Sequence, residues 1–196
     1  MGCSSSTDVQ PTSKTPSEAP PPIEKKAGHS SASILSGEEV AILKESWNDL
    51  NEASDLSGLG KRVFLQAFEM RPEMKRVFPF GNCWGDDLLK HPKFQAHAQS
   101  FMVIIENCVD NVDNESYDFT EGLFQLGQSH SDRIGFSQEN VEVFLKSILA
   151  VWHDLLKSYD SRIEGIWSKF LAHIITIMQN GYESALNETS SRIPDL

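Results

Sequence analysis

The sequence has little cysteine and no long apolar run. Three cysteines in 196 residues, Cys3, Cys83 and Cys108, are too few for a disulfide framework, and they fit a reducing compartment. No apolar stretch approaches the length of a membrane span. The N-terminus also lacks the apolar core of a secretory signal peptide. These absences argue against a small secreted domain and against an integral membrane protein.

Basic residues are also scarce. The chain carries 17 Lys and Arg against 28 Asp and Glu, a net charge of −11. Residues 1–36 hold three residues of each sign and sum to zero, so the acidic excess lies on residues 37–196. Binding to phosphates requires clustered Lys and Arg, so we expect no nucleic-acid partner. The same excess argues against adsorption of the body to an anionic membrane by charge alone.

Residues 1–34 have the composition of a disordered tether. Five of the nine prolines lie between Pro11 and Pro22, and residues 7–33 are rich in Ser, Thr, Pro, Lys and Glu. Few large apolar residues are present in this stretch, so it cannot form a core.

The tether begins with the pattern of a lipid anchor. Met1 is followed by Gly2, the acceptor in N-myristoylation, and Ser6 lies at the preferred hydroxyl position. One myristoyl chain gives only marginal anchoring, and since no polybasic cluster supplies a second signal, we expect Cys3 to be palmitoylated. The sequence thus predicts a peripheral protein on the cytoplasmic side of a membrane, namely the plasma membrane. The alternative is an ordinary disordered terminus that happens to begin Met-Gly-Cys.

The remainder predicts an all-α domain over residues 35–187, with residues 188–196 as a frayed tail. No proline occurs from residue 93 to residue 193, and alternating patterns are rare. Helix starts are predicted where a capping residue or proline precedes an apolar stripe. These signals are Ser36 with Glu39, Ser54 or Asp55, Pro72, Pro92, Ser137, and Ser161 with Glu164.

Two histidines lie in apolar stripes on different helices. Leu123, Leu126, Gly127 and His130 have the spacing of one helical face, and His97 belongs to a stripe 33 residues earlier. A lone histidine near a helix end is more often a capping or core residue, but a buried imidazole needs a partner. Zinc would require further nearby ligands, whereas haem needs one axial histidine and accepts apolar walls.

With these residues in place, the sequence resembles the globin family from about Ser36 to Leu186. It looks most like the acylated, membrane-attached globins such as globin X, and the segment near Phe78, Asn82 and Cys83 resembles neuroglobin. The matching positions are Trp47, Arg71-Pro72-Glu73, Phe78, His97, Leu126, His130 and Trp167.

The resemblance implies a globin fold of about eight helices around a haem b pocket. It makes His130 the proximal ligand and His97 the distal residue, which either binds iron or contacts the bound gas. Phe101 stands where the family usually has Val or Ile, which implies a narrowed pocket. Because Cys83 and Cys108 do not match the family's disulfide pairs, we expect free thiols. The expected haem contacts are Phe78, Phe64, Phe94, Phe101, Leu126 and Ile134.

For function, the resemblance implies reversible binding of O₂, NO or CO by a haem that is six-coordinate without ligand. Such a site favours oxygen or redox sensing, electron transfer with an external donor, or protection near a membrane. One alternative is an enzyme that reduces nitrite or dioxygenates NO with an external reductant. Others are a globin for oxygen storage or transport and a haem-free globin fold. We do not expect a dedicated enzyme.

Overall fold

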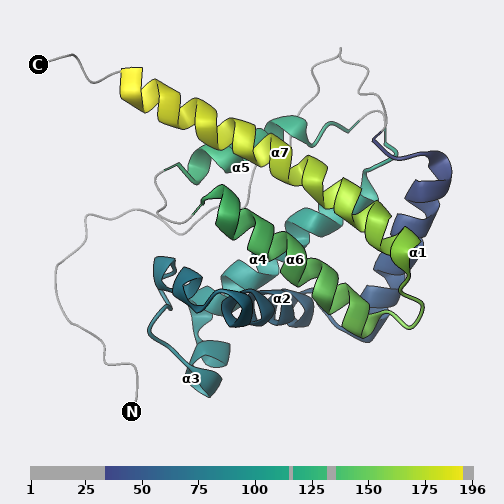
Figure 1. Ribbon diagram of the computed structural model, residues 1–196, viewed down its shortest axis with the longest axis horizontal. Coiled ribbons are helices and arrows are strands. Elements are labelled where there is room, and N and C mark those ends of the chain that lie inside the picture. The colour runs from purple at the N-terminus through teal and green to yellow at the C-terminus, as the bar shows by residue number, and fades with distance from the viewer. Residues whose placement is uncertain (1–33, 115–116, 132–135, 192–196) are drawn as a thin grey trace, which may run out of the picture.

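The computed structural model describes residues 34–114, 117–131 and 136–191. These residues form eight helices and no strand, which confirms the predicted all-α class (Figure 1). The helices are α1 (Gly37–Ala53), α2 (Leu56–Met70), the 3₁₀ helix η1 (Pro72–Val77), α3 (Gly85–Lys90), α4 (Pro92–Asp110), α5 (Thr120–Ser129), α6 (Gln138–Leu155) and α7 (Ser161–Ser191). No helix within the described ranges is long and apolar enough to cross a membrane.

Most helix starts lie where the capping signals predict them. The Ser36 hydroxyl accepts from the Glu39 amide at 3.2 Å, and the Glu39 carboxylate accepts from the Ser36 amide at 2.6 Å, which completes the capping box. Asp55 caps α2, and Ser137 caps α6. Pro72 occupies the first turn of η1, where its missing amide hydrogen costs nothing.

Three local expectations differ from the structure. No helix start is predicted between Pro72 and Pro92, yet this segment contains the short helix α3. The predicted capping box of Ser161 and Glu164 is wrong, because the Asp160 carboxylate caps α7 by accepting from the amides of Arg162 and Ile163. Helix α7 also continues to Ser191, so the start of the stretch expected to be frayed is helical.

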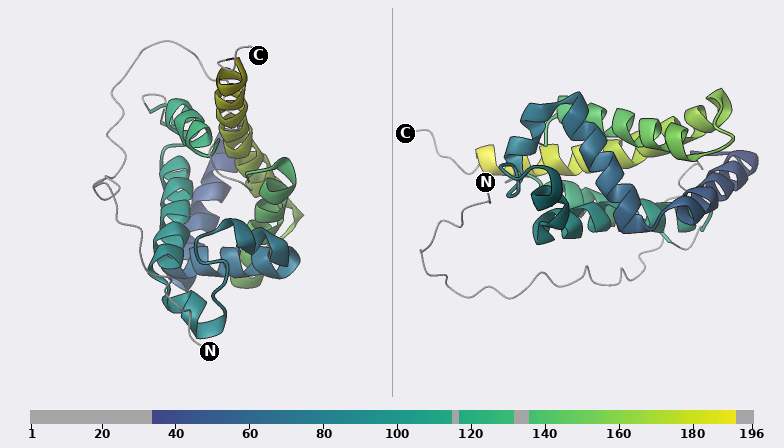
Figure 2. Two further views of the ribbon diagram at one scale, coloured as in Figure 1. Left: turned by 90° about the vertical axis from the view of Figure 1, so that its left-hand side faces the viewer. Right: turned by 90° about the horizontal axis from the view of Figure 1, so that it is seen from below.

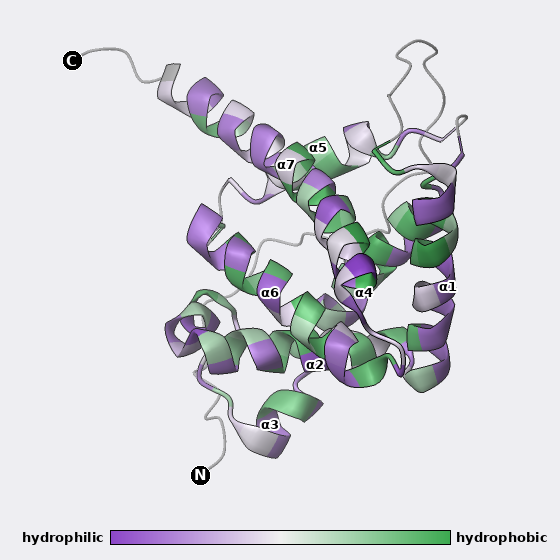
Figure 3. Ribbon diagram, turned by 45° about the vertical axis from the view of Figure 1, so that its right-hand side comes forward, coloured by the Kyte–Doolittle hydropathy of each residue, from purple (hydrophilic) through white to green (hydrophobic). Residues whose placement is uncertain are grey.

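The larger of two cores is organised around three tryptophans. The rings of Trp47, Trp152 and Trp167 lie 5.6–6.2 Å apart, and all three are buried. The Trp167 indole donates to the Ser46 hydroxyl at 3.0 Å, which satisfies its buried N–H. This cluster joins α1, α6 and α7 at one end of the molecule. Figure 3 shows apolar and polar residues sharing each of these helices, as amphipathic packing requires.

The second core is smaller and rich in phenylalanine. It gathers residues of α2, η1, α3 and α4 around buried Phe64. Helix α2 packs on both α4 and α6, while α5 packs on α7, an arrangement visible from two further directions in Figure 2. The packing therefore places the two histidine-bearing segments on different supports, His97 on the α2 side and His130 on the α7 side.

Candidate functional site

The site begins with a wall of phenylalanine rings. Buried Phe64 makes edge-on contacts with six other rings, at centroid distances of 4.8–6.2 Å. These rings come from α2, α4, α6 and the turn after η1. Edge-to-face pairs fix ring orientation as well as position. The rings that surround Phe64 are Phe68, Phe78, Phe94, His97, Phe101 and Phe144.

His97 is held against this wall but is not buried in it. Its ring lies 5.3 Å from Phe64 and 5.4 Å from Phe78, edge-on to both. The side chain is nevertheless exposed, which differs from the expectation of a histidine inside an apolar face. The reason is local: the buried positions of α4 on either side of it are Phe94 and Ala98, so position 97 lies just off the buried stripe.

Helix α4 presents two neighbouring apolar stripes. The stripe through Ala98 and Met102 is buried against the rest of the body. The stripe predicted from the sequence has two buried ends and a middle that is exposed or only half-buried; its residues are Phe94, His97, Phe101, Ile104 and Cys108. Apolar side chains left partly uncovered beside a histidine make a surface suited to a flat apolar group.

His130 lies at the other histidine-bearing segment, at the C-terminal end of α5. Its Nδ1 is 2.7 Å from the Leu126 carbonyl oxygen. A carbonyl oxygen can only accept, so Nδ1 carries the hydrogen, and in the neutral form of the ring Nε2 is then the atom with the lone pair. The half-buried ring also lies 4.9 Å from the ring of Phe136. A neutral imidazole oriented through Nδ1 is the usual form of a metal-ligating histidine.

The position of α5 is set by two glycines. A Cβ atom on Gly127 would lie 1.9 Å from the Met178 carbonyl oxygen, and one on Gly181 would lie 2.0 Å from the Phe124 carbonyl oxygen. The backbones of α5 and α7 therefore touch at a reciprocal crossing that no larger residue allows. Gly127 precedes His130 by less than one helical turn, so this crossing also determines where the imidazole lies.

The other predicted haem contacts divide into three groups. Phe78 is half-buried and faces His97, whereas Phe94 is fully buried behind it, between Phe64 and Phe80. Leu126 contributes through its backbone carbonyl, a role that its side chain did not indicate. Three predicted residues lie outside the described ranges: Ile134, Gly2 and Cys3.

The cysteines of the body are not linked. Cys83 and Cys108 are both buried, and neither forms a disulfide, in agreement with the prediction. Burial raises the pKa of the Cys108 thiol to about 12, so it stays protonated at neutral pH and does not act as a nucleophile.

The potential metal-binding side chains around His130 fit a cofactor better than a bare metal ion. Among the residues that the structure describes, no group of three or more His, Cys, Asp or Glu is placed to hold a metal. An ion bound by His130 must therefore bring its other ligands with it. Haem brings four ring nitrogens, and its flat apolar surface matches the half-buried apolar side chains of α4.

Comparisons with known proteins agree with this reading. The family model described as Globin matches residues 61–178, more than half of the chain. The globin polymeric component P3 of Glycera dibranchiata is 31% identical over 133 residues, which cover 67% of this chain and 84% of that protein. Neuroglobin-1 of Oncorhynchus mykiss is 24% identical over 151 residues, covering 76% and 92%.

Two solved structures share the fold at low identity. A hexacoordinated haem protein from an anhydrobiotic tardigrade gives a TM-score of 0.68 at 22% identity, over 76% of this chain and 96% of that one. A hexa-coordinate haemoglobin of Drosophila melanogaster, studied for cyanide binding, gives 0.63 at 22% identity, over 74% and 93%.

The glycine crossing yields a test of packing. Gly127→Ala should lower the free energy of unfolding by about 1–3 kcal/mol, because the added methyl group forces α5 away from α7. The control is Gly165→Ala, also in α7, where a Cβ meets nothing within 4 Å. Alanine favours a helix over glycine, so this control should be neutral or stabilising by up to about 1 kcal/mol. Urea unfolding followed by circular dichroism measures both, and equal effects would contradict the crossing.

Proposed function

This chain belongs to the globin family, and from that premise we propose that it binds haem b through Nε2 of His130. The observation that carries the proposal is the 2.7 Å contact between Nδ1 of His130 and the Leu126 carbonyl oxygen. This contact leaves Nε2 as the free donor atom of a neutral ring. When bound, haem supplies an iron that binds diatomic gases and exchanges electrons.

We propose that His97 is the second axial ligand when no gas is bound. Phe64 and Phe78 hold its ring edge-on at 5.3 and 5.4 Å, and its exposure leaves the imidazole able to reach a ligand. Gas binding then requires His97 to leave, so the apparent affinity falls with the fraction of open sites. The hexacoordinate haem proteins of similar fold support this reading.

The function that follows is reversible binding of O₂, NO or CO, coupled to redox sensing, electron transfer or protection. Histidine on both sides can serve both oxidation states of the iron, so little must reorganise when an electron moves. The proposal requires an external electron donor as a partner. Because gas must compete with His97, bulk oxygen carriage is the less favoured role.

We further propose that the N-terminal residues attach the protein to the cytoplasmic side of a membrane. Gly2 is the myristoylation acceptor and Cys3 the palmitoylation site. Two acyl chains give stable residence, whereas one gives only reversible binding. Attachment would concentrate the redox function close to lipid.

Removing the proximal ligand tests haem binding. His130→Ala should weaken haem affinity by more than about 100-fold, since loss of a ligand costs more than loss of its orienting partner. Haem transfer to apomyoglobin, followed by absorbance, measures the affinity. His153→Ala is the control, because this histidine is exposed on α6 and pairs with Asp154. A His130→Ala protein that kept its haem and colour would refute the assignment.

Removing the distal histidine tests six-coordination. His97→Leu should raise the CO association rate about tenfold or more if the open form is populated at about 10% or less. Split visible bands of the ferrous protein should also merge into one broad band. Gln99→Leu, exposed on the same helix, should change neither. A broad band in the unmodified ferrous protein would exclude six-coordination.

Blocking acylation tests attachment. Gly2→Ala should move most of the protein from the membrane fraction to the soluble fraction of cells that express the full chain. Ser4→Ala is the matched control, because position 4 lies within the pattern but is not selected by it. Unchanged partitioning of Gly2→Ala would remove the acylation proposal and leave the haem proposal untouched.

A further inference from the structure

The exposed apolar side chains are concentrated in one part of the body. Six large hydrophobic residues are exposed in the described structure, and four of them lie between residues 70 and 89. Trp84 is the most exposed of the six, at 69%. An exposed tryptophan leaves a large apolar area in contact with water, so its position indicates a surface that binds a partner. The four residues are Met70, Val77, Trp84 and Leu89.

Trp84 is held in place by a buried cation. The Lys75 ammonium lies 3.4 Å from the centroid of the indole and also donates to the Cys83 carbonyl oxygen. Lys75 itself is only 2% exposed. A cation against one face of an indole fixes the ring and leaves the opposite face free to contact a partner. Trp84 is therefore presented in a fixed orientation, which reduces the entropy cost of binding.

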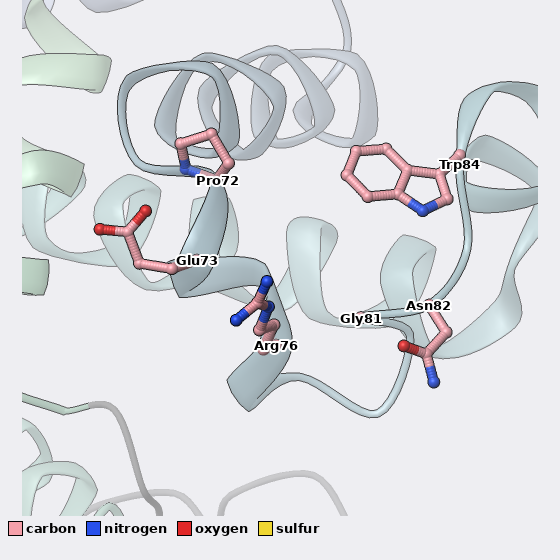
Figure 4. Close-up of a pocket in the computed structure, with 6 residues that line it drawn as sticks. All are labelled: Pro72, Glu73, Arg76, Gly81, Asn82 and Trp84. Atoms are coloured by element: carbon pink, nitrogen blue, oxygen red, sulfur yellow. The ribbon is translucent and has the colours of Figure 1, made fainter.

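The indole borders a hollow of about 390 Å³. Figure 4 shows Trp84 on one side, Pro72 and Glu73 on the other, and Arg76 between them. The Glu73 carboxylate is paired with the Arg71 guanidinium at 3.0 Å. The Arg76 guanidinium also attracts this carboxylate. Arg76 is the exposed cation among the residues that line the hollow, and Lys75 lies behind the indole ring. We call Arg76, Trp84 and the residues between them that line the hollow the Trp84 surface.

The charge of this region differs from that of the rest of the chain. Residues 71–93 contain five Lys and Arg and three Asp and Glu, a net charge of +2. The whole chain carries −11, so the remaining residues carry −13. Lys75 is one of these cations and is buried, and Arg71 is paired with Glu73 and Glu139, so the exposed charges of this segment nearly balance. A nearly balanced segment on a strongly acidic protein is the part least repelled by an anionic partner, which orients the body toward it.

We propose that the Trp84 surface docks against the anionic phospholipid headgroups of a membrane. Trp is enriched at the boundary between headgroups and hydrocarbon, because its ring is apolar and its N–H is polar. Arg76 pairs with phosphate at the same depth, since guanidinium matches phosphate geometry. The acidic body prevents binding by charge alone, and the exposed apolar residues supply the additional attraction.

The surface and the acyl chains have separate roles. An acylated tether keeps the body near the lipid at high effective concentration, which makes a weak surface contact sufficient. The contact then sets which face of the body meets the membrane. The inference rests on neither haem binding nor acylation, because the surface is described without them.

The experiment uses the full-length Gly2→Ala protein, so that acylation cannot contribute. Vesicles of phosphatidylcholine, alone or mixed with phosphatidylserine, are sedimented with the protein at low salt. We expect several-fold more protein on the vesicles that contain phosphatidylserine, and a several-fold loss with Trp84→Ala. Arg76→Glu should give a similar loss. Leu186→Ala, which truncates an exposed apolar residue on α7 at 39% exposure, should bind as the parent does.

Several outcomes would overturn the proposal. Equal sedimentation with both vesicle types would remove the anionic partner, and equal binding of Trp84→Ala and its parent would remove the surface. An acidic protein partner in place of lipid would produce the second outcome. Trp84 and Arg76 are exposed, so truncation opens no cavity, and an unchanged circular dichroism spectrum confirms that a loss of binding is not unfolding.

Discussion

The hydrogen bond from His130 Nδ1 to the Leu126 carbonyl oxygen is the interaction on which the site depends. It joins residues four apart at the last turn of α5, where the Leu126 carbonyl oxygen also accepts from the Ser129 hydroxyl at 2.7 Å, so side chains satisfy a carbonyl that no backbone amide of the helix reaches. It also selects the tautomer in which Nε2 is a donor to metal. The same contact therefore caps the C-terminal end of α5 and orients the imidazole for metal binding. The bond can do this only if α5 is held in one position, which the crossing of Gly127 and Gly181 ensures.

The two cores have different roles: one joins helices, and the other supports a histidine. The tryptophan cluster joins α1, α6 and α7 with buried rings, of which Trp167 donates a hydrogen bond to Ser46. The phenylalanine wall around Phe64 is also packed, but it ends at half-buried Phe78 and Phe101 beside exposed His97. Packed rings on one side and half-buried rings beside it position the His97 side chain without burying it.

Local chemistry explains which features the sequence could predict. The capping box at Ser36, the cap at Asp55 and the proline of η1 were predictable, because each acts within a few residues. Helix α3 was missed because its N-cap, Trp84, makes no side-chain cap hydrogen bond. The crossing of Gly127 with α7 joins residues about fifty positions apart, and no single-sequence pattern encodes such a contact. For the same reason, periodicity predicted a buried face through His97 and Phe101, whereas the neighbouring helices cover Ala98 and Met102; periodicity alone does not show which of two adjacent stripes is covered.

The acidic charge of the body and the Trp84 surface together affect how the protein is oriented at anionic lipid. A protein with a net charge of −11 is repelled by anionic lipid in most orientations. The Trp84 surface, with its exposed indole, lies in a segment whose charges nearly balance, so it is repelled least. Repulsion elsewhere then strengthens the preference for this surface, because most other orientations are unfavourable. The acidic body and the Trp84 surface thus act together, and a tethered protein with this charge distribution would meet the membrane in a preferred orientation.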